Sequence, residues 1–339
     1  MDDRTGRAVS AAGDINGDGI DDLVISADRA SPGGINSAGS TYVVFGSNSD
    51  LPNPFNVSSL DGTNGFIING SSSFDQTGTS LSTAGDINGD GIDDLIIGAD
   101  RAGISGSSYV VFGSNTGFTN PLNLSDLNGS NGFLINGQSS GDFLGFSVSA
   151  AEDVNDDGID DLIMGARGAD PGGNSFAGSS YVIYGSDSGI PHPFDLSTLN
   201  GTNGFALNGI AENDYSGISV SATGDINGDG MDDLIIGASG ADPNGSNSAG
   251  SAYVVFGSDA GISHPFDLSA LNGVNGFTVN GVSNSDTTGY SVSEAGDFNG
   301  DGLNDILIGA RRADPDDNIN AGSSYVVFGN DVIFRDGFE

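Results

Sequence analysis

"AGDINGDGIDDLVISA", residues 12–27, places four aspartates, one asparagine and three glycines directly before a run of apolar residues. Asp, Asn and Gly in this density are typical of a tight turn, and the apolar run is typical of a buried strand. Aligned on Asp14, similar segments start at Asp86, Asp153, Asp225 and Asp297. Five copies indicate an internal repeat. Because a regular repeat is the signature of a repeat architecture, the fold is best derived from one repeat unit.

The spacings between these aspartates are 72, 67, 72 and 72 residues. The short spacing has one cause. The second unit takes 23 residues from Asp86 to Tyr109, whereas the first takes 28 from Asp14 to Tyr42. A five-residue deletion in one connection therefore explains the irregularity, and the five units are equivalent.

Each unit predicts four short strands: a small polar one, an apolar one such as "DDLIIGA", the "SSYVVFG" strand, and one similar to "GFLING". The second and third are continuously apolar, which indicates burial on both faces. Small sheets covered on both sides and repeated around an axis form a β-propeller. We therefore expect an all-β fold, a single domain over residues 1–339 with five four-stranded antiparallel blades of ~72 residues. An open arc of a larger propeller is the alternative.

The fourth strand occurs in four copies for five acidic loops. After Gly329 only "NDVIFRDGFE", residues 330–339, remains, and its apolar residues are Val332, Ile333, Phe334 and Phe338. This C-terminal segment is predicted either to supply the closing outer strand of the fifth blade or to be a loose tail or sorting tag.

The acidic loop has the residue types of a calcium site. Counting from its first aspartate, positions 1, 5 and 9 are always Asp and position 3 is always Asn, so oxygen ligands alternate along a tightly turned chain. Position 6 is Gly, which permits a sharp turn, and position 7 offers only its backbone carbonyl. The predicted ligands, one ion per repeat and about five ions in all, are Asp14, Asn16, Asp18, Ile20 and Asp22; Asp86, Asn88, Asp90, Ile92 and Asp94; Asp153, Asn155, Asp157, Ile159 and Asp161; Asp225, Asn227, Asp229, Met231 and Asp233; and Asp297, Asn299, Asp301, Leu303 and Asp305.

Two other interpretations of the loop fit its residues less well. An EF-hand needs a bidentate Glu at position 12, but position 12 is apolar in every copy, as at Ile25, so the pattern indicates a hairpin loop. A solvated Asp-Gly turn would not explain why positions 1, 5 and 9 stay acidic five times. Position 8 is Asp in four copies and Asn304 in the fifth, and it is predicted to be a surface residue rather than a ligand.

With "GFSVS", the D-x-N-x-D-G-x-x-D loop, "DLIIGA" and "YVVFG" recurring from about Thr5 to Gly329, the sequence resembles the FG-GAP repeats of integrin α-chain propellers, and more closely their bacterial relatives. The resemblance implies a propeller whose loops between the first two strands of each blade bind calcium on one face. The chain departs from the family in having five repeats where integrins have seven. The proline of the family's "GAP" is also replaced, for example by Asp28.

Composition excludes several classes of function. The formal charge is −38, from 42 Asp, 4 Glu, 8 Arg and no Lys, which argues against nucleic acid and anionic lipid surfaces as partners. Without Cys there are no disulfides or thiolate metal sites. No stretch is apolar for 18 residues, so no membrane insertion is expected. The N-terminal "MDDRTGRAVS" does not have the pattern of a signal peptide.

Other candidate residues do not form catalytic machinery. His192 and His264 occupy equivalent connections with no nucleophile nearby and are predicted to be surface loop residues, and the four Glu form no recurrent pair. Five arginines follow the second predicted strands, on the face opposite the acidic loops: Arg29, Arg101, Arg167, Arg311 and Arg312. They are expected either to pair locally with aspartates such as Asp28 or to recognise acidic groups.

The sequence therefore predicts a non-enzymatic, extracellular or cell-surface, calcium-binding propeller with a structural, adhesive or self-assembling role. Its partner would be a protein, a glycan or further copies of itself, as a homo-oligomer or head-to-tail polymer. A carbohydrate-binding propeller is the alternative, and a polysaccharide-active enzyme is the third hypothesis.

Overall fold

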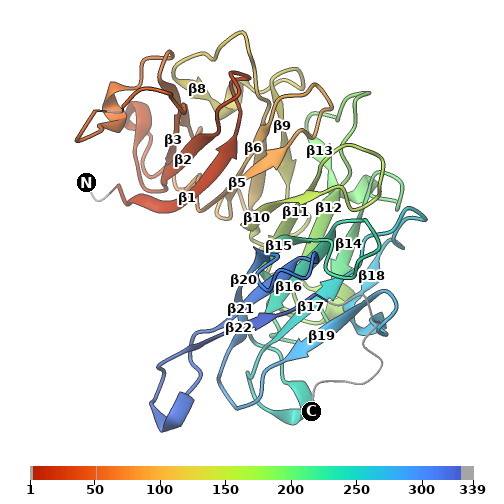
Figure 1. Cartoon of the computed structure of the whole chain (residues 1–339). Coiled ribbons are helices and arrows are strands. Elements are labelled where there is room, and N and C mark those ends of the chain that lie inside the picture. The colour runs from red at the N-terminus through yellow and green to blue at the C-terminus, as the bar shows by residue number, and fades with distance from the viewer. Residues whose placement is uncertain (1–2, 51, 330–339) are drawn as a thin grey trace. The chain divides into compact units, whose positions relative to one another are not determined.

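The structure, a computed structural model, describes residues 3–50 and 52–329 (Figure 1). Its strands form five sheets, one for each repeat, and the described residues contain no α-helix, which confirms the predicted all-β propeller class. The segment 330–339, with its predicted closing strand, lies outside the described residues. Short 3-10 turns occur in the connections, at η1 (Pro32–Gly34), η2 (Val57–Ser59), η3 (Leu124–Asp126), η4 (Pro171–Gly173), η5 (Leu196–Thr198), η6 (Pro243–Gly245), η7 (Leu268–Ala270) and η8 (Pro315–Asp317).

The chain divides into two compact units, and the first comprises residues 1–150 and 185–197. Its first sheet has the order β1 (Thr5–Gly13), β2 (Asp22–Ala27), β3 (Ser40–Val44), β4 (Gly65–Asn69) and β8 (Leu122–Asn123). Its second sheet has the order β5 (Ser80–Gly85), β6 (Asp94–Ala99), β7 (Ser107–Val111), β9 (Gly132–Asn136) and β13 (Phe194–Asp195).

The second unit comprises residues 151–184 and 198–339, and the boundary between the units falls within β10 (Leu144–Glu152), a strand of the third sheet. The other strands of the third sheet are β11 (Asp161–Ala166), β12 (Ser179–Ile183), β14 (Gly204–Asn208) and β18 (Phe266–Asp267). The fourth sheet is β15 (Ser216–Gly224), β16 (Asp233–Ala238), β17 (Ser251–Val255) and β19 (Gly276–Asn280), and the described part of the fifth is β20 (Thr288–Gly296), β21 (Asp305–Ala310) and β22 (Ser323–Val327).

The four predicted strands of a repeat follow one another across its sheet, with the small polar strand at one edge. In the fourth sheet β15 pairs with β16, β16 with β17, and β17 with β19, all antiparallel. The sequence did not predict the two-residue strand that three sheets add beyond the fourth. In the first sheet this extra strand, β8, comes from the next repeat and runs parallel to β4. Consecutive repeats are therefore joined at their outer edges as well as through their faces.

Apolar side chains of consecutive sheets form the core. One cluster in the first unit combines Ile15, Val24 and Val43 of the first repeat with Leu81 and Leu95 of the second, and all five are at most 8% exposed. Clusters of the same kind join the third repeat to the fourth and the fourth to the fifth in the second unit. Since the middle strands bury side chains on both faces, their continuous apolar sequences follow from this packing.

The connections that carry the two histidines hold neighbouring repeats together. His264 Nδ1 accepts a hydrogen bond of 3.1 Å from the backbone N–H of Ala206, and His192 Nδ1 accepts one of 3.2 Å from Leu134. Asn120 Oδ1 accepts the equivalent bond from Ile67 at 3.1 Å. Both histidines are exposed residues of connections, as predicted, and their imidazoles in addition bind the fourth strand of the preceding repeat. Their neutral form, with Nδ1 as acceptor, makes this contact.

Candidate metal centres

Each acidic loop joins the first and second strands of its sheet and so lies at one end of that sheet. The first loop runs from Asp14, just after β1, to Asp22, the first residue of β2. Gly19, at position 6, has a φ of 86°, a conformation that favours glycine. Gly17, at position 4, also has a positive φ, of 71°. The predicted turn at position 6 is thus accompanied by a second one at position 4, which brings alternate side chains to one side.

The carboxylate at position 1 organises the loop. Asp14 Oδ1 accepts the N–H of Asp18 at 2.9 Å, and Asp14 Oδ2 accepts the N–H of Gly19 at 2.7 Å. The N–H of Ile20 then donates to Asp18 Oδ1 at 3.0 Å. The other four loops repeat all three bonds with lengths between 2.7 and 3.1 Å. One loop conformation therefore recurs five times, and it uses both carboxylate oxygens of position 1 and one of position 5 as acceptors.

The carboxylate at position 9 is buried in every loop. Asp22 is 1% exposed, and its four equivalents are completely buried: Asp94, Asp161, Asp233 and Asp305. One oxygen accepts the N–H of the glycine after the third strand, as from Gly113 to Asp94 at 2.8 Å and from Gly257 to Asp233 at 2.9 Å. Since the strand backbone holds this group inside the sheet, it cannot turn out into water when it ionises.

Burial raises the pKa of Asp94 to about 8, and the carboxylates of Asp90 and Asp86 raise it further against the hydrogen bond from Gly113. Burial likewise raises the pKa of Asp233 to about 8, against two backbone hydrogen bonds, with Asp229 and Asp225 adding to the rise. The pKa of Asp22 rises to about 6 for the same reasons. The ionised carboxylates at positions 1, 5 and 9 therefore repel one another, and a bound cation would reduce this repulsion.

The first loop contains two buried acceptors that fit a cation. Asn16 Oδ1 and Asp22 Oδ2 are both buried and have no hydrogen-bond partner in the described chain. A buried acceptor without a donor is costly, and a hard cation compensates it as a donor would. These atoms belong to positions 3 and 9 of the predicted ligand set.

Within the described residues, no three side chains of His, Cys, Asp or Glu are already arranged to hold a metal ion. The three aspartates of a loop therefore do not suffice by themselves. The donor set that fits calcium includes the amide oxygen of Asn at position 3 and the carbonyl oxygen at position 7, which are ligands that calcium accepts. The ligand assignment for the five loops stays a prediction, supported by the repeated loop conformation and the two buried acceptors.

Position 8 binds the neighbouring repeat, so its description as a surface residue was incomplete. Asp93 Oδ2 accepts the N–H of Asp14, in the preceding loop, at 2.7 Å. Asp232 Oδ2 accepts the N–H of Asp153 in the same way at 3.1 Å. In the fifth repeat Asn304 uses its own N–H to donate to the carbonyl of Asp225 at 3.2 Å. Within each unit, the loops of consecutive repeats are thereby linked through the residue next to position 9.

Glu152 stands where the other four repeats have glycine, immediately before position 1. It has a φ of 56°, close to the 60–64° of the equivalent glycines, Gly13, Gly85, Gly224 and Gly296. Its side chain bonds that of Asp232, and burial, followed by the charges of Asp232 and Glu294, raises the pKa of Glu152 to about 8. A strained backbone and a crowded acid thus coincide at this one position.

Glu152→Gly is expected to stabilise the protein by roughly 1 kcal/mol, because glycine tolerates the left-handed conformation and the crowded carboxyl is removed. Thermal unfolding in calcium measures the effect as a higher melting temperature. Glu212→Gly, which removes an exposed carboxyl elsewhere, is the matched control and should give no gain. A Glu152→Gly protein that melts no higher than the parent would contradict the assigned strain.

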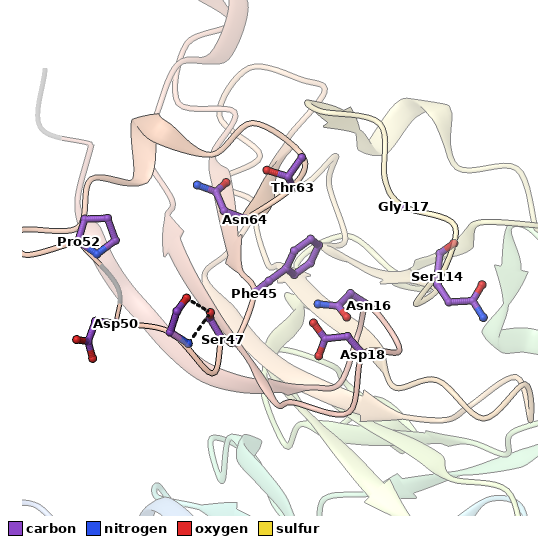
Figure 2. A pocket seen from close by; sticks show the side chains of 13 residues that line it. Asn16, Asp18, Phe45, Ser47, Asp50, Pro52, Thr63, Asn64, Ser114 and Gly117 are labelled. Atoms are coloured by element: carbon purple, nitrogen blue, oxygen red, sulfur yellow. Dashed lines mark hydrogen bonds between the residues drawn. The ribbon is translucent and has the colours of Figure 1, made fainter.

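A polar hollow of about 450 Å³ lies beside the first acidic loop. Figure 2 shows Asn16 and Asp18 next to each other on one side of Phe45, with Thr63 and Asn64 on another. Its lining is mostly hydroxyl, amide and carboxylate groups around one aromatic ring, the combination that contacts a polyhydroxylated ligand.

At two positions the structure does not have the predicted pairing of an arginine with a nearby aspartate. Asp28 pairs with Arg4 at 3.2 Å rather than with Arg29. Arg311 lies over the ring of Tyr290, with its guanidinium carbon 3.5 Å from the ring centre. In the fifth repeat the arginine is therefore held by a cation–π contact rather than by an aspartate.

Comparison with known proteins gives one family match and several relatives. The FG-GAP repeat model matches residues 5–44, 77–111, 144–183, 216–255 and 288–327, together more than half of the chain. The chain is 32% identical over 259 residues to "Integrin alpha pat-2" of Caenorhabditis elegans, covering 72% of this chain and 19% of the relative. It is 28% identical over 235 residues to "Integrin alpha-PS2" of Drosophila melanogaster, covering 68% and 15%.

A second group of relatives has a different name. The chain is 34% identical over 161 residues to "Phosphatidylinositol-glycan-specific phospholipase D" of Rattus norvegicus, covering 48% of this chain and 18% of the relative. The chain thus spans about a fifth or less of the length of these curated relatives. The similarity concerns the repeats and not the remaining four fifths of those proteins.

Proposed function

Because the chain belongs to the FG-GAP repeat family, we propose that it is a non-enzymatic, calcium-binding propeller module of the adhesion type, with one ion in each acidic loop. The observation that carries the proposal is the buried carboxylate at position 9. It recurs in all five repeats, next to the acidic positions 1 and 5. Calcium would supply the positive charge that such a group needs in order to stay ionised inside the sheet.

Each residue of a loop has a separate role in this proposal. Position 1 holds the turn through two backbone N–H groups, and position 9 anchors the loop to the third strand through a glycine N–H. The side-chain oxygens of positions 1, 3, 5 and 9 and the carbonyl of position 7 would bind the ion. The residue at position 8 would connect the ion-bound loop to the neighbouring repeat, as Asp93 does by accepting a hydrogen bond from the N–H of Asp14. Ion binding would in this way stiffen the contact between repeats.

An extracellular or cell-surface location is part of the proposal. Loops with three carboxylates and an amide suit the weaker affinities of extracellular calcium modules. Five divalent ions would also remove ten units of the formal charge of −38. No helix among the described residues has the length and apolar character needed to cross a membrane. The integrin α relatives, by name, support a role in adhesion with a protein partner.

Phospholipase activity is not assigned to this chain. The relatives that bear that name share only about a fifth of their length with it, and the shared part is the repeats.

Calorimetric titration of the ion-free protein with calcium tests the proposal, and about five ions per chain are expected. Asp94→Asn, which keeps the size of the side chain but removes its charge, should lose one ion. Asp187→Asn, in an exposed connection outside the loops, carries the same charge change and should bind the parent number. No calcium binding at millimolar concentration would refute the proposal.

A carbohydrate-binding propeller is the second candidate, and the hollow beside the first acidic loop favours it. This hollow lies on the acidic-loop side of the first sheet, since Asn16 and Asp18 belong to its lining. Binding to a glycan array that Phe45→Ala abolishes would support this candidate. Calcium titration of Phe45→Ala, with the parent stoichiometry, would show that the acidic loop is intact.

A further inference from the structure

In each of the first three sheets, a connection from the following repeat covers the outer edge. After its third strand, the later repeat places a two-residue strand beside the fourth strand of the earlier repeat, in parallel. The pairs are β8 with β4, β13 with β9 and β18 with β14. On β14, Phe266 lies opposite Leu207 and Asp267 lies opposite Asn208, and the other two pairs have the same register.

Three kinds of contact hold this connection on the third sheet. His264 Nδ1 accepts the N–H of Ala206 at 3.1 Å. The side-chain amide of Asn208 donates to Asp267 Oδ1 at 3.1 Å. Phe266 is 8% exposed and belongs to the apolar cluster that joins the third and fourth repeats. One acceptor, one apolar side chain and one further acceptor therefore cover the edge.

The fourth sheet has no such cover, because among the described residues it ends at β19. Phe277 and Val279 of β19 are only partly buried. At the same two positions the first three sheets have completely buried residues: Phe66, Ile68, Phe133, Ile135, Phe205 and Leu207. The N–H of Thr278 has the place in the register that Ala206 has on β14, so it points to the open edge. Unpaired backbone groups on an edge strand favour the addition of another strand.

The segment 330–339, outside the described residues, has the residues of this connection at the same spacing. We count from the glycine that follows the third strand of each repeat. The seventh residue after it is Asn or His in the first four repeats and Asp336 in the fifth. The ninth is Phe or Leu in those repeats and Phe338 in the fifth, and the tenth is Asn or Asp and then Glu339. Both acceptors and the apolar residue are therefore retained.

We propose that the segment 330–339 docks on the open outer edge of β19 and runs parallel to it, with Phe338 opposite Val279 and Glu339 opposite Asn280. The docking site and the segment belong to the same compact unit. This assignment differs from the closing outer strand of the fifth blade that the sequence predicted. It goes beyond the proposed function and is independent of calcium, since none of these residues belongs to an acidic loop.

The polar groups of the two partners are complementary. A carboxylate oxygen of Asp336 accepts the N–H of Thr278, as an amide or imidazole acceptor does on the first three sheets. Asn280 Oδ1 already accepts the hydroxyl of Ser251 at 3.0 Å, which leaves the N–H groups of its amide to donate to Glu339. Hydrogen bonds to an ionised carboxylate are stronger than those between neutral groups.

Disulfide formation within single chains tests the register, because the chain has no cysteine. The double variant Asn280→Cys, Glu339→Cys should form its disulfide as completely as Asn208→Cys, Asp267→Cys, whose parent side chains are hydrogen-bonded. The matched control is Val274→Cys with Glu339→Cys, because Val274 is 71% exposed but lies before the opposite end of β19. A cysteine at 339 that links equally to positions 280 and 274, or to neither, would overturn the proposal.

Amide hydrogen exchange, measured by NMR, tests whether the segment covers β19. Phe338→Asp should speed the exchange of the β19 amides roughly tenfold, because a buried aromatic side chain no longer covers the strand. Phe74→Asp is the matched control, since Phe74 is 61% exposed and belongs to the first unit, and it should leave β19 unchanged. Faster exchange on β22 instead of β19 in Phe338→Asp would assign the segment to the fifth sheet and overturn the proposal.

A second pair of variants tests the acceptor. Asp336→Ala should speed exchange most at the N–H of Thr278, which loses its partner. Asp336→Asn should keep the parent rate, because Asn120 Oδ1 makes the equivalent bond to the N–H of Ile67. A Thr278 N–H that exchanges at one rate in the parent and in both variants would show that Asp336 does not contact β19, and the proposal would be wrong.

Discussion

Removing calcium with excess EDTA is expected to lower the free energy of unfolding by about 2.7 kcal/mol for each site that had been held at 100 times its dissociation constant. The effect is large because five loops act together and each of them holds a buried carboxylate beside two others. Without the ion, positions 1, 5 and 9 repel one another at the hairpin that joins the first two strands. Thermal unfolding with and without the chelator measures the loss.

Two variants separate loss of the ion from other effects of the chelator. Asp94→Asn removes one site and should reproduce a fraction of the drop in melting temperature, with a smaller further drop on adding EDTA. Asp187→Asn should melt as the parent in both conditions, because it changes the same charge at an exposed connection. Equal melting temperatures of the parent with and without excess EDTA would remove any stabilising role for calcium.

In the ion-free protein, stability is expected to fall steeply as the pH rises from about 4 to about 8. The raised pKa values of Asp94 and Asp233, about 8 instead of 3.8, mean that the folded state binds these protons more tightly than the unfolded state does. Their contribution is therefore present at low pH and is lost as the pH passes through the folded values. A pKa that differs by one between the folded and unfolded states corresponds to about 1.4 kcal/mol, so two such groups make this one of the largest pH effects in the chain.

Calcium should remove this fall, because an ion-bound carboxylate is already ionised and has no proton to lose. Calcium binding should correspondingly release protons, and its apparent affinity should increase with pH over the same interval. Melting temperatures measured from pH 4 to 8, in EDTA and in calcium, give two curves that separate as the pH rises. The Asp94→Asn, Asp233→Asn double variant in EDTA should show a flatter curve than the parent. Parallel curves for the parent in EDTA and calcium would be inconsistent with buried ligands at position 9.

Much of the local structure was predictable because it depends on residues close together in the sequence. The loop that begins at Asp14 was predicted from its alternating oxygens, and its turn at Gly19 has the positive φ that glycine allows. The small first strand and the apolar strand that starts at Asp94 were placed correctly for the same reason. Short-range rules about turns and strand burial suffice for these elements.

Contacts between repeats could not be derived in the same way. Asp93 looked like a surface residue because its own repeat gives it no role, yet it accepts a hydrogen bond from Asp14, 79 residues earlier. His264 likewise bonds Ala206 in the preceding repeat. The one available signal was recurrence, since each of these positions carries a hydrogen-bonding side chain in repeat after repeat.

The sequence by itself determined the repeat, the order of its strands and the chemistry of its acidic loops, because these depend on spacing within about 20 residues. Only the tertiary structure decided which copies of the same strand are covered. Leu23 and Leu95 both follow two aspartates at the start of equivalent strands, yet Leu23 is 54% exposed and Leu95 is completely buried. The physical reason is that burial depends on whether another sheet lies against that face, and no residue within the strand itself can specify its neighbour.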